Sequence, residues 1–585
     1  MSRRRPESKL MTPGDFRRPT AFWENRPPDD DESGLHDCEN GSDIDVPEDD
    51  RTPAFLVFQG GGAKGIVHVG ALSAVEDEKL SIQGVAGTSA GAMVAALAAA
   101  GYQGYELFHA ESKTHILSAL GPRLGFNKAV DFFGWGPWQV IRLCRLVAPH
   151  FLPITIWGLI LAFAGLSWLD AYYPILAKTV GVLLCIGAVA LVSRLLKGIT
   201  TVKRVRDFID HALEHKLGLK IRDSKGITFE QLAKAGGLPL SIVATNVSDK
   251  CGEVFSRERT PHVPVADAVA ASICLPGIFQ PWSFLCTRGS GFDKDARERR
   301  FLDGGFISNL PVWTLDSERE LVEDAVTIAF GIVPAKPSAE TPHEGHWLGA
   351  ISSSVIAGTM ELDMRGVEDA IHVPIACELD LLDFDAGVSR LGQAVTQSRA
   401  AVRERLKEDL TTYPEILDLA CEHLRAELMD KINSASNVWV IPGPFQVKVA
   451  LALRPRGYYG SLATAYGRGF RVPPDPDGDI TDAWETGKYS YAQGTGGDDD
   501  EWAGQFWRLT IPCYDLDSSG ALARIDNRPL RPLVIVVEFD LALHVPIAPD
   551  ASDAFMRILH STVLNYVQQS GLHKAVQRST SLPWH

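Results

Sequence analysis

The sequence has few of the residues that several common kinds of protein depend on. Its nine cysteines are scattered over 585 residues without a C-x-x-C pair, which argues against a disulfide framework and for a reducing compartment. No Cys, His, Asp and Glu cluster has the spacing of metal ligands, so we expect neither a metal nor another cofactor. The net charge of −16 disfavours nucleic acid as a partner, because phosphate binding needs a basic surface.

Apolar side chains are also scarce in residues 1–52, which are rich in Pro, Asp, Arg and Ser. Such a segment cannot bury enough surface to offset its ordering entropy, so we expect a disordered N-terminal arm. No apolar stretch follows Arg3, Arg4 and Arg5, which argues against a cleaved secretory signal. At 585 residues the chain is too long for one ordinary core, and two or three domains are expected.

Glycine, in contrast, is concentrated where a catalytic turn would need it. The stretch Gly87–Gly91 reads G-T-S-A-G and fits the nucleophile elbow G-x-S-x-G, whose glycines let a strand turn sharply into a helix. A short apolar strand is predicted before it at Ile82–Ala86, and an alanine-rich helix after it. Open α/β sheets place their sites at the carboxyl ends of such strands. Ser89 is therefore the candidate nucleophile.

A second glycine loop, Gly60–Gly65, follows the apolar run Phe55–Phe58 and precedes a predicted helix. Backbone N–H groups at such a junction are free to bind an anion, and an oxyanion hole needs two or three of them. We assign this role to Gly60, Gly61, Gly62 and Ala90. Lys64 is either a contact for an anionic headgroup or a solvated surface lysine.

The same loop also satisfies the dinucleotide fingerprint G-x-G-x-x-G through Gly60, Gly62 and Gly65. That fingerprint expects an acidic residue at the end of the next strand, and Ala86–Ser89 has none. Because Ile66 follows Gly65, the loop is not a Walker loop. Nucleotide binding is therefore disfavoured.

A serine hydroxyl needs a base, usually histidine, to take its proton. No histidine here lies in a matching motif; His68 and His109 fall on predicted helices, where a structural role is the commoner one. The stretch Asp303-Gly304-Gly305 offers a carboxylate at a tight turn, although the same three residues also form ordinary turns. A carboxylate base would need partial burial to raise its pKa.

Four segments together resemble the patatin-like phospholipases. They are Gly60–Gly65, Gly87–Gly91, Ala266–Phe279 and Phe301–Pro311. The family has a three-layer α/β/α core and uses a serine and aspartate dyad without histidine. The resemblance implies that Asp303, in the D-G-G motif, is the base for Ser89. Gly65, Gly87, Gly91, Gly304 and Gly305 would then shape the elbow and the turns.

A long hydrophobic insertion, residues 146–196, separates the serine from the aspartate. Two apolar runs, about 147–169 and 175–196, are each long enough to cross a bilayer. Basic residues flank both ends, so the positive-inside rule puts the termini and the catalytic core in the cytoplasm. Just upstream, an interfacial aromatic cluster is expected from Phe132, Phe133, Trp135 and Trp138. A buried helical pair and a re-entrant hairpin are the alternatives.

We place the end of the catalytic domain, residues 53–411, after a helix predicted at Gly392–Leu406. Residues 412–585 are expected to form an α+β accessory domain of unknown role, whose protein partner, if any, is unknown. Its predicted elements are strands at Gln446–Leu453, Phe506–Tyr514 and Leu533–Val545 and a helix at Asp553–Gln569. Residues 472–504, dense in Pro, Gly and Asp, predict a long loop or disorder. The run Asp498–Asp500 lacks EF-hand spacing and is read as solvated charge.

These observations predict a membrane-associated serine acyl hydrolase with an α/β core, an inserted helical hairpin and an accessory domain. The resemblance implies membrane phospholipids or lysophospholipids as substrates, with neutral acylglycerols and acyl transfer left open. A catalytically inactive, membrane-anchored interaction protein on the same core is the alternative. The intact Ser89, Asp303 and glycine loop argue against it.

Overall fold

The computed structural model describes two compact units, which divide between Arg405 and Leu406. The described residues are 51–109, 112, 114–147, 197–219, 226–289, 295–322, 325–335, 363–364, 370–434, 446–453, 464–466, 478–495, 505–513, 524–525, 528–529, 533–540 and 549–572, with a few more between 167 and 186. The predictions for residues 1–50 and for Asp498–Asp500 lie outside them. The domain boundary predicted near residue 411 stays a prediction.

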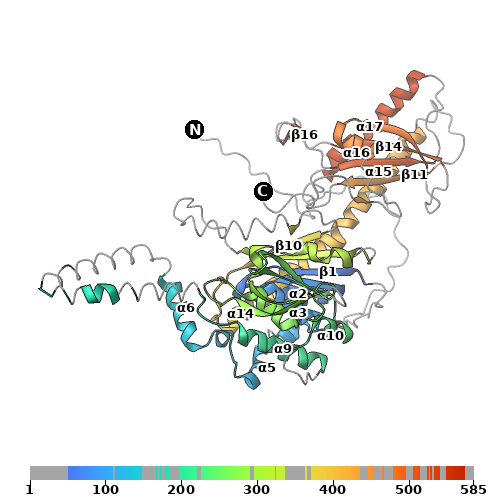
Figure 1. Ribbon diagram of the computed structural model, residues 1–585. Coiled ribbons are helices and arrows are strands. Elements are labelled where there is room, and N and C mark those ends of the chain that lie inside the picture. Colours follow the sequence, from blue (N-terminus) through green and yellow to red (C-terminus); the bar gives the residue numbers. More distant parts are fainter. Residues whose placement is uncertain are drawn as a thin grey trace. The chain divides into compact units, whose positions relative to one another are not determined.

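The first unit is built on a mixed sheet of eight strands (Figure 1). The order is β10-β9-β1-β2-β5-β8-β7, and β6 pairs with β5. The strands from β10 to β5 run parallel, whereas β6, β7 and β8 are antiparallel to their neighbours. The bounds are β1 Pro53–Phe58, β2 Ser81–Thr88, β5 Leu240–Asn246, β6 Cys251–Phe255, β7 Trp282–Arg288, β8 Asp295–Leu302, β9 Val326–Pro334 and β10 Ala370–Cys377. The expected α/β core is confirmed, and the structure shows that its central sheet is mixed.

Helices α2, α3 and α11 pack against this sheet. The α-helices of the unit are α2 Val67–Asp77, α3 Ala90–Ala99, α4 Gly104–Leu107, α5 Ile116–Leu120, α6 Trp135–Val147, α9 Lys203–Leu217, α10 Phe229–Lys234, α11 Val265–Ile273, α12 Asp316–Arg319 and α14 Val388–Lys407. Helix α14 packs closely on α2 because Gly70 has no side chain: a Cβ there would overlap Ser398 and the Val395 carbonyl.

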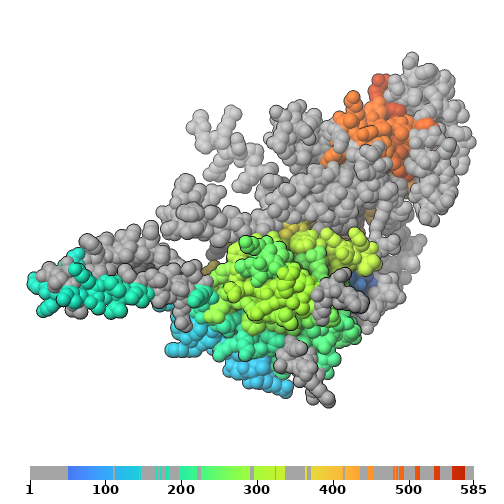
Figure 2. Space-filling view, viewed as in Figure 1, coloured from blue at the N-terminus to red at the C-terminus, as the bar shows by residue number. Residues whose placement is uncertain are grey.

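Strands β1 and β2 lie at the centre of the sheet and carry the two glycine motifs. From Ala54 to Phe58 every side chain is at most 1% exposed, as expected for a strand covered on both faces. Phe58 pairs with Gly87, so both strands end at the same edge. The yellow-green residues that follow β5 make up most of this unit's surface visible in Figure 2.

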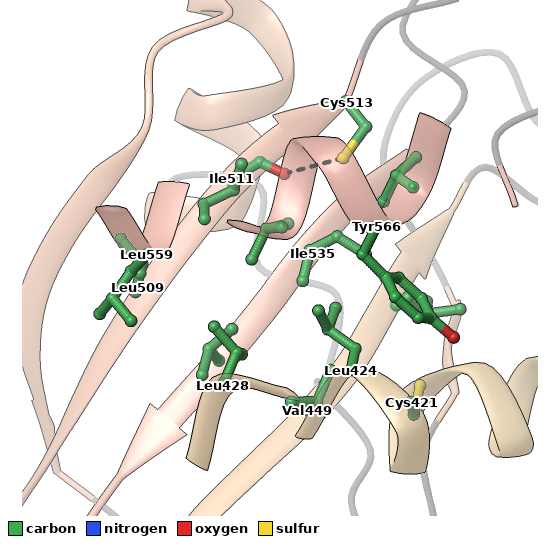
Figure 3. Packing of buried hydrophobic residues seen from close by; sticks show 14 of the residues in the cluster. Cys421, Leu424, Leu428, Val449, Leu509, Ile511, Cys513, Ile535, Leu559 and Tyr566 are labelled. Carbon is green, nitrogen blue, oxygen red and sulfur yellow. Dashed lines mark hydrogen bonds between the residues drawn. The ribbon is translucent and has the colours of Figure 1, made fainter. Parts of the chain in front are cut away.

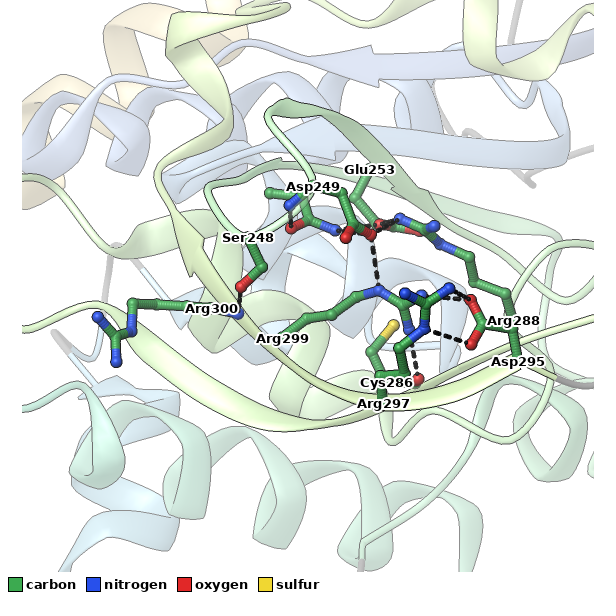
Figure 4. Close-up of polar contacts among 10 residues, drawn as sticks. Ser248, Asp249, Glu253, Cys286, Arg288, Asp295, Arg297, Arg299 and Arg300 are labelled. Atoms are coloured by element: carbon green, nitrogen blue, oxygen red, sulfur yellow. Dashed lines mark hydrogen bonds and ion pairs between the residues drawn. The ribbon is translucent and has the colours of Figure 1, made fainter.

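A buried charge network holds the antiparallel extension formed by β6, β7 and β8 (Figure 4). Arg299 on β8 is 1% exposed, and its guanidinium donates to the Asp249 carboxylate at 2.8 Å and to the Cys286 carbonyl at 2.9 Å. Arg288 on β7 pairs with Glu253 on β6. A buried guanidinium is tolerated only with such partners. The network fixes β8, whose next residue is Asp303.

The expected interfacial aromatic cluster is wrong for three of its four residues. Phe132, Phe133 and Trp138 are at most 8% exposed, and only Trp135 is open to solvent, at 83%. The Phe133 ring lies 5.3 Å from that of Phe279 and 4.9 Å from that of Phe384. Partners far away in sequence bury these rings, which a reading of the local pattern does not reveal.

Most of the insertion lies outside the described residues, which are continuous again from Lys197. Among the helices that the structure does describe, none combines the length and apolar character needed to cross a bilayer. The predicted membrane hairpin therefore stays a prediction.

The second unit is an antiparallel sheet in the order β12-β11-β17-β14-β13. Its bounds are β11 Val447–Leu453, β12 Thr464–Tyr466, β13 Ser490–Thr495, β14 Gln505–Cys513, β17 Leu533–Phe539, α15 Tyr413–Ser434, α16 Asp479–Thr486 and α17 Pro549–Ser570. Alternate strand residues face α15 and α17, where Leu424, Ile511 and Leu559 join one core (Figure 3). The intervening residues pack against α16.

The prediction of a long loop or disorder at residues 472–504 is wrong in part, because α16 and β13 form there. Ile480 and Ala483 lie three residues apart and pack on the sheet, and Trp484 joins them. The Tyr491 ring of β13 stacks on Trp507 at 5.3 Å. Tertiary packing of a few apolar side chains thus outweighs the polar composition of this segment.

Candidate active site

Ser89 occupies a strained turn between β2 and α3. Its φ of 52° and ψ of −122° belong to a region that residues other than glycine rarely adopt. The flanking glycines make this turn sterically feasible, because a Cβ on Gly87 would lie 2.5 Å from the backbone of Gly91. One on Gly91 would overlap the Phe58 carbonyl. The backbone therefore has the geometry of a nucleophile elbow.

Hydrogen bonds from two distant segments hold the strained turn. The Ser89 amide donates to Ser272 Oγ at 2.8 Å, and that hydroxyl donates to the Val243 carbonyl at 2.6 Å. Thr88 Oγ1 donates to the Ser308 carbonyl at 2.8 Å. Strain of this kind persists only where surrounding contacts over-determine the backbone, and these bonds are such contacts.

The Ser89 hydroxyl donates directly to the carboxylate of Asp303. The Oγ–Oδ2 distance is 2.7 Å, and both side chains are buried. The other carboxylate oxygen accepts the Gly305 amide at 2.8 Å. Gly304 lets the turn lie against β5, where any Cβ would overlap the Val243 carbonyl. The two residues, 214 positions apart in sequence, thus form a hydrogen-bonded pair without an intervening histidine.

Burial tunes the carboxylate of this pair. Loss of water raises the pKa of Asp303 to about 6, and the hydrogen bonds from Gly305 and Ser89 hold it below what burial alone would give. Such a group is mostly ionised at neutral pH, yet it is more basic than an exposed aspartate. It is therefore suited to accept the proton of a hydroxyl during nucleophilic attack.

The glycine loop brings free amides to the same edge of the sheet. Among the described residues, none accepts a hydrogen bond from the amides of Gly61, Gly62 or Ala90. A Cβ on Gly65 would lie 2.5 Å from the Ala90 Cβ, so this glycine lets the loop touch the start of α3. These three amides remain the candidate oxyanion donors.

Gly60 does not fit the predicted role of an oxyanion donor. Its amide donates to the Asn309 carbonyl at 3.1 Å and is therefore already used. The position instead needs a glycine for space, because a Cβ there would lie 2.5 Å from Asn309 Oδ1 and 3.2 Å from the Ser89 Cβ. Gly60 thus ties the loop to the segment after Asp303.

Lys64 is half-buried on the short helix Gly62–Ile66, and no ion pair of its side chain is found within the described part of the chain. Its contact with an anion stays a prediction. His68 is buried on α2 and bonds the Gln59 carbonyl at 2.8 Å; burial lowers its pKa to about 4, which keeps it neutral. His109 lies on a short strand, Phe108–His109, and not on the expected helix.

Three residues near the pair were not singled out from the sequence. Ser272 and Asn309 lie inside the motif segments Ala266–Phe279 and Phe301–Pro311, so those motifs contain the signal. Asp363 gave none. Its carboxylate accepts Ser308 Oγ at 2.8 Å and the Leu310 amide at 3.0 Å, and so holds the segment that binds Gly60 and Thr88. Burial raises the pKa of Asp363 to about 6.

Comparison with known proteins agrees with this geometry. Residues 56–119 and 186–316 match the model of the family described as patatin-like phospholipase. The matched segments include Ser89, Asp303 and both glycine motifs.

Within the described residues, no group of three or more His, Cys, Asp or Glu side chains is placed to hold a metal ion.

Individual relatives are distant. An uncharacterized protein of Bacillus subtilis, YqhO, is 26% identical over 280 residues, which cover 47% of this chain and 70% of that protein. VipD from Legionella pneumophila is similar with a TM-score of 0.29 at 17% identity, covering 67% of this chain and 78% of its own. ExoU of Pseudomonas aeruginosa, in complex with SpcU, is similar with a TM-score of 0.25 at 16% identity. The match covers 67% of this chain and 63% of the ExoU chain. The chain therefore contains a patatin-like phospholipase domain, matched over residues 56–119 and 186–316.

Proposed function

We propose that this chain is a serine lipid acyl hydrolase that cleaves the acyl esters of phospholipids or lysophospholipids with a Ser89–Asp303 dyad. The observation that carries the proposal is the 2.7 Å hydrogen bond from the Ser89 hydroxyl to the buried Asp303 carboxylate, at a strained elbow. Membership of a family of lipid acyl hydrolases supports the reaction class.

The dyad performs the reaction in two steps. Ser89 Oγ attacks the ester carbonyl while its proton passes to Asp303 Oδ2, and the amides of Gly61, Gly62 and Ala90 stabilise the oxyanion. The ester C–O bond then breaks, and Asp303 gives the proton to the leaving alcohol oxygen. In the second step water attacks the acyl-serine and passes its proton through Asp303 to Ser89, which frees the fatty acid.

Exposed apolar side chains beside the site support a lipid substrate. Phe306 and Ile307, which follow the Asp303 turn, are 39% and 42% exposed, and Leu381 beside Gly62 is 41% exposed. Acyl chains gain free energy when they leave water for such a surface. We further propose that the insertion at residues 146–196 anchors the protein in a membrane, with the termini and core cytoplasmic.

Ser89→Ala should reduce hydrolysis of labelled phospholipid by about 10⁴-fold or more, since the variant has no nucleophile. A fluorophosphonate probe should label the wild-type protein at Ser89 and leave the variant unlabelled. Ser73→Ala is the matched control. Ser73 is also a buried serine, but it lies on α2, and its hydroxyl donates only to the Val69 carbonyl of the same helix. Full activity of Ser89→Ala would exclude the proposed nucleophile, and an unlabelled wild type would favour an inactive scaffold.

Replacing residues 146–196 with a flexible Gly/Ser linker should release the protein from membranes. Activity on phospholipid vesicles should fall by about tenfold or more, because the enzyme no longer concentrates at the lipid surface. Activity on a dispersed short-chain ester should change little. Vesicle flotation and the two assays, run on the same preparation, measure these effects. An equal loss on both substrates would contradict the anchoring role.

A further inference from the structure

The loop at residues 378–387, between β10 and α14, contacts the glycine loop directly. The Leu381 carbonyl accepts the Ala63 amide at 2.9 Å. It also lies 2.5 Å from the position that a Cβ on Gly62 would take. The placement of Gly62 and Ala63 therefore depends on the placement of Leu381. The 378–387 loop thus supports the amides to which we assign the oxyanion.

Asp383 gives the 378–387 loop its shape. Its side chain is buried, and the Oδ2 atom accepts the Asp380 amide at 3.0 Å. The Asp383 amide in turn donates to the Asp380 carbonyl at 3.1 Å, which closes a tight turn around Leu381. A buried carboxylate of this kind needs a cationic partner.

Arg145, near the end of α6, is the nearer of two arginines that meet this carboxylate. Its guanidinium pairs with the Asp383 carboxylate and also donates to the Leu382 carbonyl at 3.5 Å. Asp385 lies 3.6 Å and Asp380 4.0 Å from the same guanidinium. One side chain on α6 thus contacts the carbonyl that follows Leu381 and the acidic residues on either side of it.

A second contact joins the same two segments. The Phe133 ring, just before α6, lies 4.9 Å from that of Phe384. Arg390 at the start of α14 also approaches the Asp383 carboxylate, at 3.5 Å, but its other hydrogen bond goes to the Glu378 carbonyl at the far end of the loop. Of these two arginines, Arg145 is the one that combines the charge pair with a hydrogen bond to the residue next to Leu381.

We propose that Arg145 is a positioning residue for the oxyanion hole: through Asp383 and Leu382 it fixes Leu381, which sets where the glycine loop presents its amides. The inference rests on the proposed function, because it assigns the oxyanion to this loop. On a soluble short-chain ester its effect belongs to the reaction step, because the amides of the glycine loop stabilise an oxyanion that forms only during that step. A misplacement of about 1 Å in such donors is enough to slow a reaction by about 10²-fold.

Arg145→Ala should therefore lower kcat on a soluble short-chain ester by about tenfold or more, with KM changed by less than about twofold. Arg145→Lys should recover part of the loss, because lysine keeps the charge but not the fork that reaches two acceptors. Arg142→Ala is the matched control: Arg142 is exposed on the same helix and has no described partner on the loop.

Combining Arg145→Ala with Asp383→Asn should cost less than the sum of the two single effects, because both changes break the same ion pair. Full additivity, or an Arg145→Ala kcat equal to that of Arg142→Ala, would overturn the proposal.

Hydrogen exchange provides a readout that needs no activity. In Arg145→Ala the peptide containing Ala63 should exchange faster by about tenfold, because the Ala63 amide loses its fixed acceptor; in Arg142→Ala it should exchange as in the wild type. Unchanged exchange would also overturn the proposal. A wild type that neither hydrolyses esters nor labels at Ser89 would refute the proposed function instead, while the exchange result still decides whether Arg145 positions the loop.

Discussion

Asp303→Asn is expected to slow ester hydrolysis by about 10³-fold and to make the protein more resistant to unfolding at about pH 8. Activity falls because an amide cannot take the Ser89 proton. Stability rises because asparagine keeps both hydrogen bonds without a buried charge: its oxygen can accept the Gly305 amide, and its NH₂ group can donate to Ser89 Oγ. Opposite changes in activity and stability are the signature of a residue kept for chemistry.

The stability difference should depend on pH in a defined direction. Burial raises the pKa of the Asp303 carboxyl from 3.8 to about 6, so the folded protein binds this proton more tightly than the unfolded chain. The stabilisation from the bound proton is complete below about pH 4 and is lost as the pH rises through 6, a change of about 3 kcal/mol. Asparagine does not titrate, so the variant's advantage should appear between about pH 4 and 7.

Thermal unfolding of both proteins at about pH 4 and pH 8 measures this advantage. Asp303→Ala is the comparison, because it is also inactive but loses both hydrogen bonds and leaves a cavity, so it should be less stable than Asp303→Asn throughout. In the wild type, kcat/KM should fall as the pH drops below about 6, where the base becomes protonated. A gap between wild type and Asp303→Asn that does not change with pH would contradict the buried charged carboxylate.

Local glycine patterns explain why much of the site could be predicted from the sequence. The turn at Ser89 needs small residues at Gly87 and Gly91. Strand β1 is a short apolar run that ends just before the first glycine motif, and β2 runs into the second. Because open α/β sheets place their sites at the carboxyl ends of the strands, Gly61 and Ser89 are expected at the same edge of the sheet. Asp303 required more, since only the family resemblance connected a common turn sequence to a serine 214 residues away.

The errors share one physical cause, which is contact between segments distant in sequence. The Gly60 amide is used by Asn309, a partner that no local pattern reveals. Phe133 resembles an interfacial residue until Phe279 and Phe384 are seen to cover it. Asp363 has no motif, and its importance appears only through its bonds to the segment after Asp303.

Gly62→Ala is expected to lower kcat on a soluble short-chain ester by about 10²-fold, an effect the size of losing one oxyanion donor. Gly62 has a φ of +54°, and a Cβ there would lie 2.5 Å from the Leu381 carbonyl. This overlap between the new methyl group and the Leu381 carbonyl can be relieved only if the glycine loop or the 378–387 loop shifts. The amides of Gly61 and Gly62 would then leave the positions in which they meet the oxyanion.

Backbone strain alone does not account for this expected loss, and a second glycine separates the two effects. Gly125 also has a positive φ, +78°, but nothing lies within 4 Å of the position its Cβ would take. Both alanine variants should therefore lose about 1–2 kcal/mol of stability from the left-handed backbone. Only Gly62→Ala also meets a carbonyl, so Gly125→Ala should keep a kcat within about twofold of the wild type. Measuring kcat well below both unfolding temperatures, with melting curves alongside, isolates the loop displacement. If the two variants lost stability and kcat to the same degree, strain would explain the result, and the glycine loop would not be the oxyanion hole.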